Sequence, residues 1–185
     1  MPTLTLFAGI NGAGKSTLYN ESMQNEYAED LGVRVNVDED VVANGGDWRN
    51  FRDYIDASER VLARINYCIE NQISFNWELT LITPFVLKIM RQAKENGFTI
   101  NLNFIGVSDP ELSIERIKNR VKNGGHGIED DTVRTRHNLQ FKNLKTALKL
   151  VNYALLYDNS KSSMDVVATY FDKELQIYKP SIWLP

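Results

Sequence analysis

A stretch of nine residues near the N-terminus constrains the fold more than any other part of the chain. It reads Gly9-Ile10-Asn11-Gly12-Ala13-Gly14-Lys15-Ser16-Thr17 and fits the pattern G-x-x-x-x-G-K-[ST]. An apolar run typical of a strand, Thr3 to Ala8, precedes it, and Ser16 to Ala28 can form a helix. In this order the glycines let backbone N–H groups turn onto phosphate oxygens at a helix N-terminus. The stretch therefore predicts a binding site for nucleotide phosphates.

The same pattern gives individual side chains their expected roles. Lys15 is expected to reach the β- and γ-phosphates of ATP, and the Ser16 hydroxyl is expected to bind Mg²⁺. ATP and Mg²⁺ are therefore the predicted cofactors. The predicted ATP-binding residues of this loop are Gly9, Ile10, Asn11, Gly12, Ala13, Gly14, Lys15, Ser16 and Thr17.

Composition sets the class of protein. The 185 residues correspond to one domain with a sizeable core, and the net charge of −3 argues against nucleic acid and anionic membranes as partners. A single cysteine, Cys68, excludes an intrachain disulfide. We find no signal-peptide pattern and no apolar run long enough to cross a bilayer, so we expect a cytoplasmic protein.

Apolar runs alternate with amphipathic segments along the whole chain. Strands are predicted over residues 33–37, 73–77, 98–107 and 153–157, with helices between them. This order predicts an α/β P-loop NTPase of the nucleoside-kinase-like, three-layer type, with a mostly parallel five-stranded sheet, helices on both faces and a short lid. The phosphate-loop strand is expected at the centre, Asp165 to Phe171 as a further strand at an edge, and residues 1–185 as one kinase domain.

Acidic residues follow several predicted strands, and the C-terminal ends of parallel strands share one edge of the sheet. Asp38 ends the second strand and is the candidate base that accepts the proton of an alcohol, with Asp40 as the alternative. Glu78 ends the third strand and is expected to bind substrate hydroxyls or a water on the metal. Asp158 and Asn159 end the last parallel strand and are expected near the adenine.

Residues of about 116–136 are predicted to form the lid. Arg116 and Arg120 lie four positions apart and share a helix face, and Gly124-Gly125-His126-Gly127 follows them. Arginines beside such a glycine segment are typical of a lid that neutralises charge on a transferring phosphate. His126 either contacts phosphate or shapes the turn, and His137 is interpreted as structural. The predicted lid residues are Arg116, Arg120, His126, Arg134 and Arg136.

Together these stretches resemble the zeta toxin family of P-loop kinases. The resemblance rests on residues 9–17, 36–39, 75–81, 120–131 and 158–160, in matching order. It implies an ATP-dependent kinase that phosphorylates a sugar nucleotide such as UDP-N-acetylglucosamine and that is restrained by an antitoxin. It also implies Lys15 as the loop lysine, Asp38 as the general base, Glu78 with Thr80 on the substrate side, and Arg116 or Arg120 on the γ-phosphate.

The chain departs from the family pattern at two places. The family usually has Phe-Glu-Thr-Thr-Leu where this chain has Trp77-Glu78-Leu79-Thr80-Leu81, so one substrate-side hydroxyl is missing. The second lid arginine of the long toxins falls near His126, and its role can pass to Arg134 or Arg136. Because the substrate side differs, the acceptor is the part of the function that the resemblance specifies least.

Other functions remain open at this stage. One is a nucleotide switch or ATPase that drives a partner, although the chain lacks the Asn-Lys-x-Asp and Asp-x-x-Gly motifs of GTPases. A second is a relative that binds nucleotide without turnover, which the presence of Lys15, Ser16 and Asp38 argues against. A third is a kinase of another small molecule or of a polynucleotide end, because such enzymes share the loop, the base and the lid.

Overall fold

The structure is a computed structural model that describes residues 1–24 and 31–184. The predicted end of the first helix, near residue 28, lies outside the described residues. In chain order the helices and strands are β1 (Thr3–Ala8), α1 (Lys15–Gln24), β2 (Val33–Val35), α2 (Val37–Ala43), α3 (Phe51–Glu70), β3 (Phe75–Leu79), α4 (Pro84–Glu95), β4 (Thr99–Gly106), α5 (Pro110–Lys122), α6 (Asp130–Leu148), β5 (Tyr153–Asp158), β6 (Asp165–Phe171) and β7 (Glu174–Ile177).

The strands form one sheet in the order β2-β3-β1-β4-β5-β6-β7. Strands β1 to β5 are parallel to one another, and β6 and β7 are antiparallel additions at one side. The mostly parallel α/β sheet is therefore confirmed, with β1 between β3 and β4 as predicted. The sheet has seven strands rather than five, and β6 is not at the edge because β7 pairs with it.

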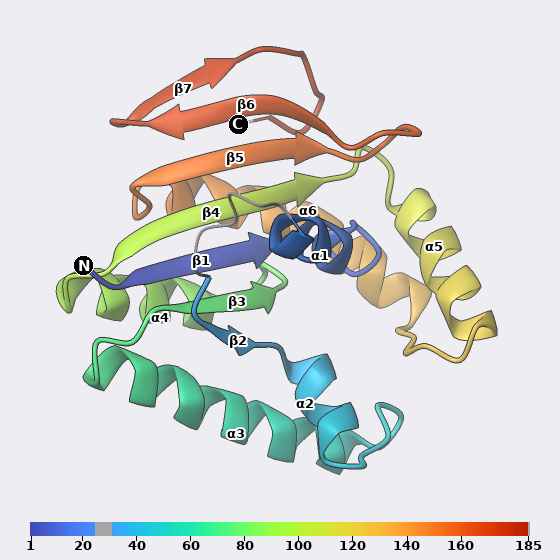
Figure 1. Ribbon diagram of the computed structural model, residues 1–185. Helices are drawn as coiled ribbons and strands as arrows, with labels where there is room; N and C mark the ends of the chain where they lie inside the picture. The colour runs from blue at the N-terminus through green and yellow to red at the C-terminus, as the bar shows by residue number, and fades with distance from the viewer. Residues whose placement is uncertain (25–30, 185) are drawn as a thin grey trace.

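Side-chain alternation along the strands divides the core between the two faces of the sheet. Helices α3, α4 and α6 pack on one face and enclose the larger cluster, while α1 covers the other face. Figure 1 shows α1 in front of the sheet and α4 and α6 behind it. Fully buried side chains of the larger cluster include Leu4, Leu6, Phe75, Ile100, Leu102 and Phe104.

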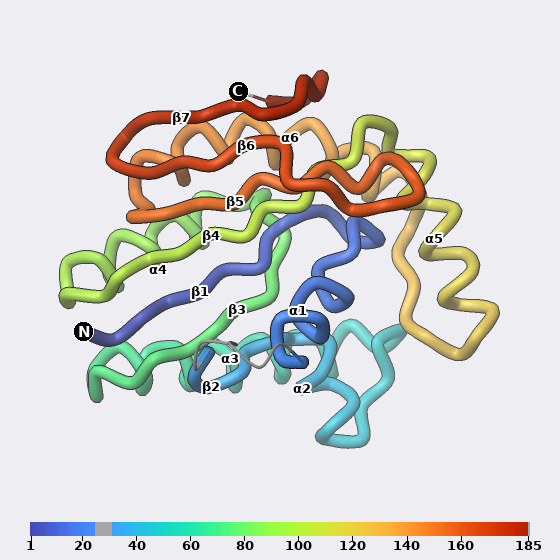
Figure 2. The backbone as a smooth tube through the Cα atoms, turned by 45° about the horizontal axis from the view of Figure 1, so that its top comes forward, coloured from blue at the N-terminus to red at the C-terminus, as the bar shows by residue number. Residues whose placement is uncertain are grey.

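The parallel strands all end at the same side of the sheet. The arrowheads of β1, β3, β4 and β5 in Figure 1 point to the side where α1, α2 and α5 lie. The tube in Figure 2 shows the same gathering, with the segment from α5 to α6 projecting beyond the strand ends. Residues that are distant in sequence are thereby collected at one edge, as the topology of a parallel sheet requires.

Two local features differ from the sequence-based expectation. Strand β2 ends at Val35 rather than at residue 37, because the Asn36 side chain accepts hydrogen bonds from Asp38 N and Glu39 N and starts α2. Strand β7 was not predicted. It follows a tight turn in which Asp172 and Lys173 both have positive φ angles, of 50° and 66°.

No helix among the described residues is long and apolar enough to cross a membrane.

Candidate active site

The phosphate loop joins β1 to α1 and is closed by backbone contacts. Gly12 has φ +78°, and a Cβ there would lie 2.6 Å from the carbonyl oxygen of Ser113 on α5. Gly14 has φ +106°, and a Cβ there would lie 2.7 Å from Asn159 Nδ2. Both positions therefore need glycine for backbone conformation and for space. The loop is held between α5 on one side and the end of β5 on the other.

Lys15 is the first residue of α1 and is buried inside the loop. Its Nζ donates a hydrogen bond of 3.1 Å to the carbonyl oxygen of Ile10. Burial lowers the pKa of this ammonium, while the charges of Glu78 and Asp38 act in the opposite direction. The side chain is thus a desolvated cation held over the loop, in the position that a bound phosphate needs.

Glu78 lies in β3 beside the phosphate loop and is held by two partners. Ser16 Oγ donates to Glu78 Oε1 at 2.9 Å, and Arg34 Nη2 lies 2.5 Å from Glu78 Oε2. Arg34, from β2, also binds Glu39 and stacks on the Tyr19 ring at 3.7 Å from its centroid. Both Glu78 oxygens are therefore engaged, one with the hydroxyl expected to bind the metal and one with a largely buried arginine.

Asp38 lies in the first turn of α2, not at the end of a strand as predicted. Its Oδ2 lies 2.7 Å from Nε2 of His126 on the segment between α5 and α6. The two atoms are at ion-pair distance, although His126 Nε2 forms no hydrogen bond within the described residues. Burial raises the pKa of the Asp38 carboxyl, but the contact with His126 and the charge of Lys15 outweigh it, and the net pKa lies below its ordinary value. Asp38 is thus an ionised carboxylate that opens onto the site.

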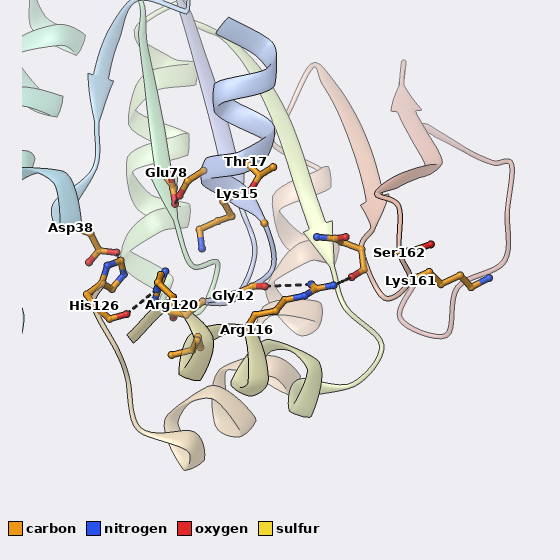
Figure 3. A pocket seen from close by; sticks show the side chains of 15 residues that line it. Gly12, Lys15, Thr17, Asp38, Glu78, Arg116, Arg120, His126, Lys161 and Ser162 are labelled. Atoms are coloured by element: carbon orange, nitrogen blue, oxygen red, sulfur yellow. Dashed lines mark hydrogen bonds and ion pairs between the residues drawn. The ribbon is translucent and has the colours of Figure 1, made fainter. Parts of the chain in front are cut away.

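Two arginines of α5 reach the site. Arg116 Nη1 donates to the Gly12 carbonyl at 3.4 Å and Nη2 donates to the Asn159 carbonyl at 2.8 Å. Arg120 Nε donates to the His126 carbonyl at 2.8 Å, and its Nη2 is buried with no hydrogen-bond partner in the described structure. Figure 3 shows both guanidinium groups beside the phosphate loop, with Arg120 next to His126 and Asp38.

The two other predicted lid arginines have different positions. Arg136, on α6, donates from Nη1 to Asn11 Oδ1 at 2.9 Å and lies at the site. Arg134 lines neither hollow of the site and forms ion pairs with Glu111 and Asp131 on the exposed surface. Its predicted role in the lid therefore stays a prediction, and in this structure its guanidinium is engaged by surface carboxylates.

Two acidic residues that sequence analysis placed at the site lie elsewhere. The Asp158 carboxylate accepts hydrogen bonds from Ser160 and, at 2.6 Å, from Ser181 Oγ, so it anchors the C-terminal tail. Its neighbour Asn159 does line the site and donates from Nδ2 to the Ala13 carbonyl at 2.9 Å. Asp40, the alternative base, is buried against Arg60 at 2.6 Å and lines neither of the two hollows described below. Both carboxylates are thus engaged outside these hollows, which differs from their expected positions, while the expected place of the adenine near Asp158 stays a prediction.

Two adjoining hollows meet at the phosphate loop. The first, of about 430 Å³, runs along the loop and includes most of the cations, with Lys161 and Ser162 at its far end (Figure 3). The second, of about 400 Å³, lies between α3, α4 and β3 and has aromatic walls. Thr80 lines the second hollow, as expected of a substrate-side residue. The residues that line both hollows are Asn11, Lys15, Asp38 and Glu78.

Sequence reasoning missed several of these residues. Arg34 gave no signal, because a lone arginine in a short strand does not identify its partner. Asn36 did carry one, since Asn followed three residues later by Glu39 is the spacing of a helix start. The aromatic walls of the second hollow, with Tyr54 and Phe85, follow from the packing of α3 beside α4 and could not be read from spacing.

Comparison with known proteins gives one related sequence of clear similarity. An uncharacterized protein of Haemophilus influenzae is 37% identical over 132 residues, which cover 71% of this chain and 89% of that protein. The chain belongs to the same family as this Haemophilus protein. No family model matches the chain.

Comparison of structures identifies the fold. The AvrRxo1-ORF1:AvrRxo1-ORF2 complex, solved with sulphate ions, matches with a TM-score of 0.72 at 15% identity, covering 96% of this chain and 61% of the other. The PezAT toxin-antitoxin system of Streptococcus pneumoniae matches with a TM-score of 0.58 at 18% identity, covering 89% of this chain and 72% of the other. The chain therefore has the same fold as these proteins, an α/β fold with a mostly parallel sheet as the sequence predicted. A further structure of the AvrRxo1 complex contains ATP. The chain spans less than two thirds of the matched chain of the AvrRxo1 complex.

Proposed function

We propose that the protein is an ATP-dependent kinase that transfers the γ-phosphate of ATP to a hydroxyl group of a small molecule. The observation that carries this proposal is the position of Asp38. Its carboxylate lies between the hollow that contains the phosphate loop and the hollow with aromatic walls. A switch protein or ATPase needs the first hollow only. A carboxylate placed between a phosphate site and a second binding site is what transfer to an alcohol requires.

The proposed reaction uses the chain's own residues as follows. The loop and Lys15 bind the phosphates, and Arg116 and Arg120 neutralise charge that develops on the transferring group. The acceptor oxygen forms a bond to the γ-phosphorus while the bond from that phosphorus to the β,γ-bridging oxygen breaks, and ADP leaves. The hydroxyl proton passes to Asp38 and then to solvent. Asp38 suits this role because its carboxylate, which is ionised at neutral pH, lies between the phosphate hollow and the acceptor hollow.

Mg²⁺ fits the oxygen atoms beside the loop. Mg²⁺ prefers oxygen ligands and is usually bound by one or two protein groups together with phosphates and waters. The Ser16 hydroxyl and the Glu78 carboxylate are in contact, at 2.9 Å, and supply such a pair. When bound, the ion would neutralise phosphate charge. Ser16 and Glu78 would hold the ion, and Arg34 fixes the second oxygen of Glu78.

The acceptor that we propose is a sugar nucleotide of the UDP-N-acetylglucosamine type. Tyr54, Trp77 and Phe85 offer aromatic surfaces in the second hollow, and Ser58 supplies a hydroxyl. Arg136 adds a cation there that forms no ion pair within the described residues. Because burying a cation without a counter-charge is costly, this favours an acceptor that carries its own negative charge.

The toxin-antitoxin neighbour also supports a protein partner that restrains the kinase, which co-purification from the native operon would test.

Two variants test the function. Asp38→Asn keeps the size of the side chain and removes its basicity, so transfer should fall by roughly two to four orders of magnitude with ATP affinity nearly unchanged. Lys15→Ala should lose transfer as well as ATP affinity, since it removes the charge against the β,γ-oxygens. The measurements are the ATP dissociation constant and untargeted metabolite profiling of a cell extract with purified protein and ATP. Wild-type transfer rates in Asp38→Asn would refute the proposal.

A further inference from the structure

The segment that holds His126 packs against α5 and Trp48. It connects α5 to α6 over residues 123–129. A Cβ on Gly125 would lie 2.5 Å from Arg120 Cγ, and a Cβ on Gly127 would lie 2.9 Å from Val121 Cγ2 and 3.1 Å from the Trp48 ring. The glycines on both sides of His126 therefore let the backbone lie directly on α5 and Trp48. This packing determines where the imidazole is placed.

Two contacts link the phosphate side of the site to Asp38 through His126. Arg120 Nε donates to the His126 carbonyl at 2.8 Å, and the His126 ring places Nε2 2.7 Å from Asp38 Oδ2. Figure 3 shows Arg120, His126 and Asp38 in sequence along one wall of the hollow. The backbone of His126 thus accepts the hydrogen bond of Arg120, while its side chain contacts Asp38. A movement of Arg120 can therefore be passed on to Asp38 through His126.

Arg120 is incompletely satisfied in this arrangement. Its Nη2 is buried without a hydrogen-bond partner, and burial lowers the pKa of the guanidinium while Asp38 and Glu78 oppose that effect. A buried donor without a partner is costly, and an anion in the phosphate hollow would satisfy it. The γ-phosphate is the anion that the proposed function brings there. Binding of ATP would consequently change the hydrogen bonding of Arg120.

We propose that His126 is a positioning residue for Asp38, and that it transmits the binding of the γ-phosphate at Arg120 to the carboxylate that accepts the proton. This inference rests on the proposed kinase function. His126 holds Oδ2, which leaves Oδ1 to accept the hydrogen bond of the acceptor hydroxyl. In the unliganded protein the two atoms are 2.7 Å apart but form no hydrogen bond, and hydrogen bonds of catalytic groups commonly become well aligned only when substrates bind. Alignment is completed when the phosphate fixes Arg120, so the base is ready only when ATP is in place.

The first test compares His126→Ala with His126→Gln. Loss of the contact should lower the transfer rate by roughly tenfold to a hundredfold, the range for a misplaced reacting group, and change the ATP dissociation constant far less. His126→Gln keeps a donor near the Nε2 position and should recover most of the rate. Lys118→Ala is the matched control, because the Lys118–Asp130 ion pair also ties α5 to α6 but lies on the exposed surface. Its transfer rate should equal that of the wild type.

The pH dependence separates positioning from simple support of the fold. Because the His126 contact lowers the pKa of Asp38, its removal should move the acidic limb of kcat/KM to higher pH in His126→Ala. The remaining ionisable groups around Asp38 are unchanged in that variant and serve as a constant background. They are Lys15, Arg120, Arg136, Glu78 and Tyr54.

A double variant tests the transmission from Arg120. If Arg120 and His126 act as one unit, Arg120→Ala combined with His126→Ala should be no more than about threefold slower than Arg120→Ala alone. If the rate losses of the two single variants multiply in the double variant, His126 does not transmit the state of Arg120. If His126→Ala has the rate and pH profile of the wild type, His126 does not position Asp38. Absence of any phosphate transfer by the wild-type protein would instead refute the proposed function itself. Melting temperatures of all variants identify any that fail to fold.

Discussion

Replacing Arg34 by Met tests the buried network that holds Glu78 beside the phosphate loop. Arg34 Nη2 lies 2.5 Å from Glu78 Oε2 and 2.7 Å from Glu39 Oε1, and Nη1 lies 3.1 Å from Asn76 Oδ1. The exposed fractions of the Arg34 and Glu78 side chains are 16% and 9%, while that of Glu39 is 53%. Nearly all of the effect should therefore arise from Glu78, because the contact to Glu39 is exposed to solvent.

Removing one partner of a buried ion pair typically costs about 3–5 kcal/mol, since a buried charge is left without a partner. Methionine loses the guanidinium that lies over the Tyr19 ring but retains most of the apolar bulk of the side chain, so we expect the lower end, about 3 kcal/mol. For a chain of this size that corresponds to a fall of roughly 6–12 °C in melting temperature. Changing Glu78 to Leu in the same protein should recover part of the loss, because it removes the unpaired carboxylate.

The assay is urea denaturation followed by tryptophan fluorescence, with thermal unfolding as a second measurement. Arg134→Met is the matched control. Arg134 also contacts two carboxylates, at 2.7 and 2.8 Å, but it lies on the exposed surface and its loss should leave the unfolding free energy close to that of the wild type. Equal stabilities of Arg34→Met and Arg134→Met would show that burial of the Arg34 network has no energetic consequence.

Three further variants test other parts of the site and fold. Gly12→Ala should weaken ATP binding measured by calorimetry, because the new Cβ meets the Ser113 carbonyl at 2.6 Å, whereas Gly45→Ala, at φ +70° with nothing within 4 Å, should bind ATP normally. Trp183→Ala should lower the unfolding free energy by about 3–5 kcal/mol, because the ring is buried and stacks on Phe141 at 5.7 Å; a loss below 1 kcal/mol, about the value for an exposed site, would contradict this. Arg136→Gln should raise KM for an anionic acceptor more than the dissociation constant for ATP; equal changes in both would assign Arg136 to ATP.

The phosphate loop and the central position of β1 could be predicted because both depend on local or topological rules. Lys15 and Ser16 follow from a spacing that only a strand, a glycine turn and a helix can satisfy. Asp38 and Glu78 could be placed together because strand ends in a parallel sheet share an edge. The rule places Glu78 at the site, and it also places Asp38 there even though β2 ends at Val35, two residues earlier than predicted, and Asp38 lies in a helix that was not predicted.

The remaining errors have a common physical cause: spacing does not reveal which partner a side chain will meet. Asp40 is two positions from Asp38, but on a helix that separation turns it toward Arg60. Asp158 is the last residue of β5 and Asn159 follows it, and these neighbouring side chains contact different parts of the structure, Asp158 the C-terminal tail and Asn159 the phosphate loop. Strand β7 was missed because its turn, Asp172-Lys173, lacks the glycine that usually marks a hairpin.

The partners of the two acidic residues explain how one site can serve two substrates. Glu78 and Asp38 both border both hollows, so position alone does not distinguish them. Glu78 is bound at both oxygens, by Ser16 and by Arg34, and cannot accept a proton without losing a buried ion pair. Within the described residues, Asp38 contacts His126 through one oxygen only. We therefore propose that Asp38, whose other oxygen can accept a further hydrogen bond, serves the acceptor, and that Glu78, which is engaged at both oxygens, serves the phosphate side.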